Sequence, residues 1–195
     1  MPILMIGLVV IVGLLLYVFL TYNKFVTTKT RIKASTQEIG NQLKRQAELI
    51  PNLVNSVKGY MKHEKKIFYQ ITEARKSVTS ALGSQDLQKM VNASEKMQTA
   101  LAPILAIFES TPELQAAKPT VKLMDELRDT ADKLMYARRT LIDLSADFNV
   151  MVVTLPSKFV AGLFGFKEML GLKTPEEGEH LEVKKEALKT PKVEL

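Results

Sequence analysis

The chain has no cysteine and no tryptophan, and it has only two histidines among its 195 residues. Without cysteine it can form no disulfide, no thiolate metal site and no cysteine nucleophile, and it offers no cysteine for lipid attachment. Two histidines leave almost no candidates for a histidine-based acid–base site. These absences favour a protein that carries out no chemistry, and the sequence predicts neither a cofactor nor a metal.

The motifs that come nearest to catalytic or metal sites are incomplete. The segment His63–Ile67 begins like the zinc motif HExxH but ends in isoleucine, so the second histidine ligand is missing. The Glu-x-x-His spacing of di-iron bundles occurs once, from Glu177 to His180, in a charged tail. Gly162 and Gly165 lack the Lys-Ser/Thr pair of a phosphate-binding loop. We interpret all three as chance matches.

An uncharged segment opens the chain. It runs from Ile3 to Asn23 as ILMIGLVVIVGLLLYVFLTYN, and the first charged side chain after it is Lys24. About 20 apolar residues, at about 1.5 Å each, cross a hydrocarbon core of about 30 Å. A cleaved signal peptide fits less well, because there is no basic region after Met1 and no small-x-small cleavage site after the run. Residues 1–23 are predicted to be a transmembrane anchor.

Basic residues follow the anchor directly: Lys24, Lys29, Arg31 and Lys33 all precede the first acid, Glu38. Positively charged flanks remain on the cytoplasmic side of a membrane. We therefore predict a single-pass protein with its N-terminus outside and its domain in the cytoplasm. At the interface the four basic residues would be attracted to anionic lipid. The alternative is that they are ordinary solvated residues of a helix.

Apolar residues recur at helical spacing after the anchor, and no segment alternates like a strand. The first helix continues the anchor, and Pro51 is expected to kink or restart it. The turn Gly59–His63 leads to a second helix that stops at Gly83, and Ser84 can cap a third. The predicted buried faces carry Ile32, Ile39, Leu43, Ile50, Leu53, Val57 and Met61; Ile67, Ile71, Ala74, Val78 and Leu82; and Leu87, Val91, Ser94, Met97, Leu101, Ile104, Leu105 and Phe108.

A fourth helix has the clearest pattern. It follows a proline-containing loop at Ser110–Pro119, which can hold one helical turn around Glu113–Ala117. Leucine or phenylalanine recurs every seven residues with a second set interleaved, as at the a and d positions of a coiled coil. The two sets are Leu127, Leu134, Leu141, Phe148 and Leu155, and Leu123, Thr130, Ala137, Leu144 and Met151. Pro156 ends the helix. These patterns predict an all-α fold, in which the N-terminal transmembrane helix continues into an antiparallel four-helix bundle over residues 24–156.

Two segments follow the bundle. Residues 157–172 are apolar and broken by glycine, and residues 173–195 are dense in charge and predicted to be a flexible tail. An even number of antiparallel passes returns the chain to the membrane, so we expect Phe159, Phe164 and Phe166 at the interface. The same residues can instead cap the open end of the bundle core, or pack against a neighbouring copy.

Four charged residues lie beside the predicted helix seams: Glu73, Arg75, Glu126 and Arg138. A charge at a buried edge normally pairs with an opposite charge, because desolvating an unpaired charge is costly. We expect ion pairs between helices that set the helix register. Binding of an anion or a protein partner is the alternative.

Several short motifs resemble, in their order, those of the bacterial LemA family. They are LKRQAELIPNLVNSVKGYMKHE at Leu43–Glu64, TEAR at Thr72–Arg75, PEL at Pro112–Leu114, DEL at Asp125–Leu127, YARR at Tyr136–Arg139 and LPSKFVAGLFGF at Leu155–Phe166. The resemblance covers nearly the whole chain from the anchor to about Phe166. The chain departs from the family pattern at Ala131–Lys133, in place of Glu-Asn-Arg, and at Leu141–Ile142, in place of Tyr-Asn.

The resemblance implies a single-pass anchor, a helical bundle and no established enzymatic activity, and some relatives take part in forming magnetosome membranes. The predicted function is a non-enzymatic scaffold or adaptor of the bacterial cytoplasmic (inner) membrane, acting by self-association or partner binding in membrane organisation. The expected partners are the lipid bilayer, further copies of the chain and an unidentified protein. Two other classes stay open: an envelope enzyme or metal-binding bundle, and a membrane-tethered nucleic-acid binder. The basic charges have no interleaved aromatics, so no nucleic acid is expected as a partner.

Overall fold

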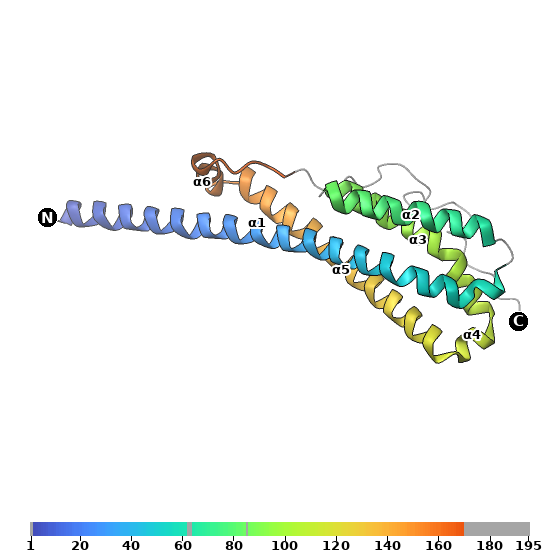
Figure 1. Cartoon of the computed structure of the whole chain (residues 1–195). Helices are drawn as coiled ribbons and strands as arrows, with labels where there is room; N and C mark the ends of the chain where they lie inside the picture. Colours follow the sequence, from blue (N-terminus) through green and yellow to red (C-terminus); the bar gives the residue numbers. More distant parts are fainter. Residues whose placement is uncertain (1, 62–63, 85, 170–195) are drawn as a thin grey trace, which may run out of the picture.

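A computed structural model describes residues 2–61, 64–84 and 86–169, and every regular element in these ranges is helical. The elements are α1 (Pro2–Val57), the 3-10 turn η1 (Lys58–Tyr60), α2 (Glu64–Ser84), α3 (Leu87–Ser110), α4 (Pro112–Ala116), α5 (Lys118–Val153) and α6 (Ser157–Phe164). Figure 1 shows one long helix that protrudes from a group of packed helices. The predicted all-α fold is confirmed.

The predicted anchor and the first helix of the bundle are one continuous helix, α1, of 56 residues. Among the described helices it alone is long and apolar enough to cross a bilayer unaided, and its most apolar stretch is not buried against the rest of the chain. Proline removes one backbone hydrogen bond from a helix interior. Even so, α1 runs through Pro51 without ending, so the expected restart at that residue does not occur.

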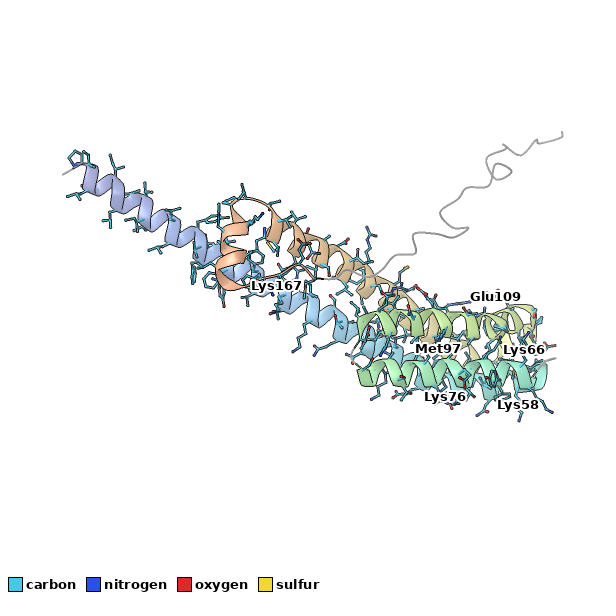
Figure 2. The ribbon with its side chains drawn as sticks, turned by 90° about the horizontal axis from the view of Figure 1, so that it is seen from above. Lys58, Lys66, Lys76, Met97, Glu109 and Lys167 are labelled. Carbon is cyan, nitrogen blue, oxygen red and sulfur yellow. The ribbon has the colours of Figure 1, made fainter. Side chains whose placement is uncertain are left out.

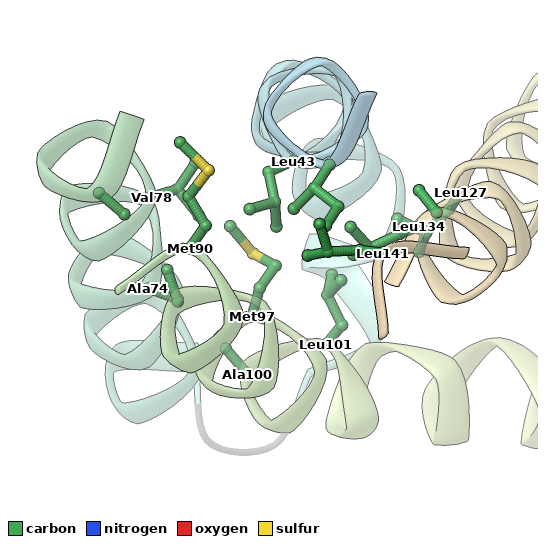
Figure 3. Close-up of a cluster of buried hydrophobic side chains, with 14 of the residues drawn as sticks. Leu43, Ala74, Val78, Met90, Met97, Ala100, Leu101, Leu127, Leu134 and Leu141 are labelled. Atoms are coloured by element: carbon green, nitrogen blue, oxygen red, sulfur yellow. The ribbon is translucent and has the colours of Figure 1, made fainter. Parts of the chain in front are cut away.

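The core of the bundle lies where α1 packs against α5 and α2 packs against α3. Figure 3 shows side chains from these helices pointing toward one another, among them Leu43, Val78, Met97 and Leu134. These four residues are at most 1% exposed. The predicted apolar faces are buried within the bundle with six exceptions. Leu155 is exposed, and five members are only partly buried: Met61, Leu82, Leu87, Leu105 and Leu123. Helical periodicity thus located the core correctly.

The seven-residue repeat of α5 is buried from Leu127 to Phe148, but its predicted last member is not. Leu155 is 69% exposed and lies beyond the end of the helix at Val153. A residue that precedes proline is pushed out of the helical conformation, so Pro156 ends the repeat before Leu155 can join it. Leu155 was therefore wrongly placed in the seam.

Two helix boundaries differ from the sequence prediction. The N-cap of α3 is Asp86, whose carboxylate accepts a hydrogen bond from the backbone N–H of Lys89 at 3.1 Å. Ser84 is instead the last residue of α2, and its hydroxyl donates to the carbonyl of Ala81. Within the predicted loop Ser110–Pro119, the short helix α4 agrees with the helical turn expected around Glu113–Ala117, but Lys118 and Pro119 belong to the first turn of α5, where proline is favoured.

Four helices lie side by side over only part of the molecule. The α2–α3 hairpin ends level with Gly40 of α1, where a Cβ atom on the glycine would meet the side chain of Leu82 at 3.3 Å. Figures 1 and 2 show α1 and α5 continuing past the hairpin toward the anchor. There α6 turns away from α5 at 93° and contacts α1. We call α1 up to Gly40, the part of α5 that continues past the hairpin, and residues 157–169 the membrane-proximal part, because they adjoin the predicted span. The remainder of the bundle is the distal part.

Candidate membrane-proximal site

Five aromatic rings join the anchor helix to the end of the described chain. Phe25 of α1 is fully buried, stacks on Phe166 with ring centroids 4.6 Å apart, and meets the edge of Phe148 at 5.5 Å. Tyr22 lies 4.6 Å from Phe164 and 5.9 Å from Phe166. Such tilted and stacked pairs stabilise a contact beyond the apolar area that they bury. Phe164 and Phe166, in the segment after α5, therefore pack against the turns of α1 that directly follow its most apolar stretch.

A side-chain amide closes the same contact. The amide nitrogen of Asn149 donates to the carbonyl of Met169 at 2.9 Å, and the backbone N–H of Met169 donates to the Asn149 oxygen at 2.8 Å. The asparagine thus satisfies both polar groups of one residue in a segment without regular structure. This pair of hydrogen bonds, together with the aromatic rings, holds residues 165–169 against α5 and α1.

The helix α6 has an inner and an outer face. Val160 and Ala161 are buried, whereas Phe159 and Leu163 are 73% and 72% exposed. Gly165 ends the helix in the left-handed conformation, at φ 70°, and lets the chain turn back. The outer face therefore presents large apolar side chains beside the anchor.

The three phenylalanines expected at the interface have different positions. Phe159 faces outward, Phe164 is 46% exposed, and Phe166 is partly buried within the aromatic cluster. Of the three alternatives drawn from the sequence, the position of Phe166 agrees with a cap on the core, whereas the outward side chain of Phe159 is available to a membrane or to a neighbouring copy.

The four basic residues that follow the anchor are divided between two sides of α1. Lys29 and Lys33 line a groove with Phe164 and Phe166, whereas Lys24 and Arg31 line a smaller hollow against α5 that also contains Asp147. The sequence grouped these four by their position in the chain. Their placement on a helix separates them into one pair whose described lining has no acid and one pair whose lining includes Asp147.

The groove beside Lys29 and Lys33, hereafter the anchor groove, has a volume of about 960 Å³. It exists because the α2–α3 hairpin stops at Gly40 and leaves α1 uncovered on that side. Leu82 and Met90 of the hairpin line it, and so do Tyr22 and Phe164 from the membrane-proximal part. Its walls are thus mostly apolar, with two lysines between them.

The four charged residues placed beside the seams have unequal partners. Arg138 of α5 lies 3.4 Å from Glu95 of α3, and Glu126 of α5 lies 3.8 Å from Arg45 of α1. Both pairs join different helices. They are partly exposed, so each contributes little to stability.

Glu73 and Arg75 are not joined to another helix by any ion pair among the described residues. Glu73 accepts a hydrogen bond from Lys76 of its own helix at 2.8 Å, and this bond and the charge of the carboxylate raise the pKa of Lys76. Arg75 is exposed and lines a shallow hollow between α1 and α2.

Sequence reasoning missed Asn149 and Phe25. A polar residue in the last turns of a helix has no periodic signature, so nothing in the pattern singled out Asn149.

Within the described residues no three side chains of histidine, aspartate or glutamate come together as a metal site. His63 and the pair Glu177 and His180 lie outside the described residues, as does the predicted tail.

Comparison with known proteins gives the same family as the motifs. Residues 35–186 match the LemA family, which extends the similarity well beyond Phe166. The chain is also similar to the magnetosome protein MamQ of Magnetospirillum gryphiswaldense, with 24% identity over 182 positions that cover 82% of this chain and 67% of the relative. The match spans most of the chain, including all four long helices of the bundle from Ser35 onward. The chain belongs to the LemA family.

Proposed function

We propose that this protein is a non-enzymatic adaptor of the bacterial cytoplasmic membrane, with its N-terminus outside and its bundle in the cytoplasm. The observation that carries the proposal is the continuity of α1, which passes from an exposed apolar span into the buried core without a break. A continuous helix connects the apolar span rigidly to the core of the bundle. About 34 residues from Lys24 to Val57, at about 1.5 Å each, extend the bundle on the order of 50 Å from the bilayer.

The surface of α5 supports a binding role. Met135 and Ile142, seven residues apart, lie on one face of α5 and are 66% and 45% exposed, and Tyr136, about 100° around the helix from Met135, is 73% exposed. Large apolar side chains grouped on a surface are typical of sites of association. Self-association and binding of another protein both use such a surface. The similarity to MamQ, whose name places it in the magnetosome, favours a role in membrane organisation.

Site-specific photo-crosslinking in growing cells tests the proposal. A photoreactive residue at Met135 is expected to give one discrete crosslinked product, because an adaptor occupies its surface with a defined partner. The mass of the product distinguishes a second copy from another protein. Lys133, exposed on the other side of the same helix, is the matched control. Equal, diffuse labelling from both positions would contradict a defined binding surface.

A further inference from the structure

The anchor groove is cationic in the part of the chain that the structure describes. Lys29 and Lys33 are the only charged residues among its described lining, and neither belongs to an ion pair among the described residues. The hydroxyl of Thr30, also in the lining, already donates to a carbonyl of its own helix at 2.9 Å. The groove therefore offers two ammonium groups and apolar walls, which together fit an anion attached to hydrocarbon.

On the side of the groove that faces the span, apolar residues and then the two lysines follow one another in the order of a phospholipid. Tyr22 and Phe164 line the end of the groove beside the span, where acyl chains lie. Lys29 lies seven residues further along α1, or about 10 Å, which is within reach of a lipid phosphate. Side chains on a helix lean toward its N-terminus, so both lysines lean back toward the bilayer. Long basic side chains commonly reach headgroups in this way.

We infer that the anchor groove binds one anionic phospholipid, with the phosphate at Lys29 and Lys33 and an acyl chain along Val26, Tyr22 and Phe164. This inference rests on the proposed membrane attachment and adds a ligand to it. The groove gives selectivity for the headgroup, because two cations with no acid among the described lining residues favour a lipid with net negative charge over a zwitterionic one. Bound lipid fills the side of α1 that the α2–α3 hairpin leaves open.

The opposite side of α1 provides an internal control. Lys24 and Arg31 carry the same charge at a similar distance from the span, but their hollow contains Asp147. General attraction to an anionic surface acts on all four residues alike. A built lipid site depends on Lys29 and Lys33 alone.

The absence of tryptophan permits a single-reporter experiment on the full chain. Val26→Trp places the reporter in the anchor groove, and Thr27→Trp places it on the opposite side at the same depth. Each protein is reconstituted in phosphatidylcholine vesicles that contain a fixed fraction of brominated phosphatidylglycerol or, in the matched series, brominated phosphatidylcholine. Bromine quenches tryptophan fluorescence on contact.

The site predicts that the anionic lipid quenches the Val26→Trp reporter more strongly than the zwitterionic lipid does. With each lysine worth roughly a factor of five in lipid association, Lys29→Gln with Lys33→Gln removes the preference, whereas Lys24→Gln with Arg31→Gln leaves it. The Thr27→Trp reporter shows little preference. Equal preference at both reporters, or equal loss in both double variants, would overturn the groove site and leave membrane attachment intact. Absence of quenching at both reporters by both lipids would overturn the attachment as well.

Discussion

The distal and membrane-proximal parts of this protein are held together by different means. In the distal part four helices bury continuous apolar faces against one another, with a regular repeat on α5. In the membrane-proximal part only α1 and α5 continue, and a short perpendicular helix, a group of aromatic rings and one asparagine complete the packing. The first arrangement depends on many similar contacts, and the second on a few particular ones.

This difference has a consequence for function. Beyond the hairpin, α1 and α5 have no second pair of long helices beside them. Exposed Phe159, Leu163 and Phe164 and the two lysines of the anchor groove lie on the surface that is left uncovered. The α2 and α3 helices, of 21 and 24 residues, are too short to follow the 36 residues of α5 along its length. The short hairpin thus creates the anchor groove, and residues at the membrane end of the chain line it.

The largest effect is expected from truncation in the distal core. Leu134 is 1% exposed, so Leu134→Ala is predicted to lower the free energy of unfolding by about 2–5 kcal/mol, from lost transfer energy and the cavity left behind. Lys133→Ala removes only an exposed ion pair with Asp129 and is predicted to cost less than about 0.5 kcal/mol. Thermal or denaturant unfolding of the two variants checks both values. Equal stability of the two would mean that the seam is assigned to the wrong face.

The distal part was the more predictable from sequence, and the physical reason lies in its regularity. A residue such as Leu134 is one of many that repeat at helical spacing, so an error at one position is corrected by the others. Asn149 acts alone, and its importance depends on where the chain goes twenty residues later. The position of Phe166 was unpredictable for the same reason, because it depends on the left-handed turn at Gly165.

An intermediate effect is expected at the asparagine of the membrane-proximal part. Asn149→Ala leaves both backbone groups of Met169 without their partner, and an unmade buried hydrogen bond costs about 1–3 kcal/mol. The loss is expected to be local, since the core of the distal part is untouched. Hydrogen exchange should therefore become faster in residues 165–169 while the melting temperature changes little. Unchanged exchange there would show that the aromatic rings alone hold the segment.

A smaller effect on stability, but a clear one on position, is expected at α6. Phe159 and Tyr136 are both 73% exposed, one beside the anchor and one in the middle of α5. Phe159→Trp and Tyr136→Trp should each change stability by less than about 0.5 kcal/mol. In vesicles that contain brominated lipid, quenching is predicted for the Phe159→Trp variant only, because the outer face of α6 would lie in the interface. Comparable quenching of both variants would remove the distinction between the two parts.

The smallest effect on the structure is expected from single cysteine substitutions at exposed positions. They test which side of the membrane holds the bundle, with its distal and membrane-proximal parts. Lys24, Lys29, Arg31 and Lys33 predict a cytoplasmic bundle, because such charges resist transfer across the membrane. The labelled position must be exposed. Ser80 is exposed, whereas a cysteine at the fully buried Ser94 would be protected from a thiol reagent in either orientation. A membrane-impermeant thiol reagent should label Ser80→Cys only after lysis and Pro2→Cys in intact cells. The chain has no cysteine of its own, so each signal comes from one site. The reverse pattern would place the bundle outside the cell, and the basic pairs would then face the other leaflet.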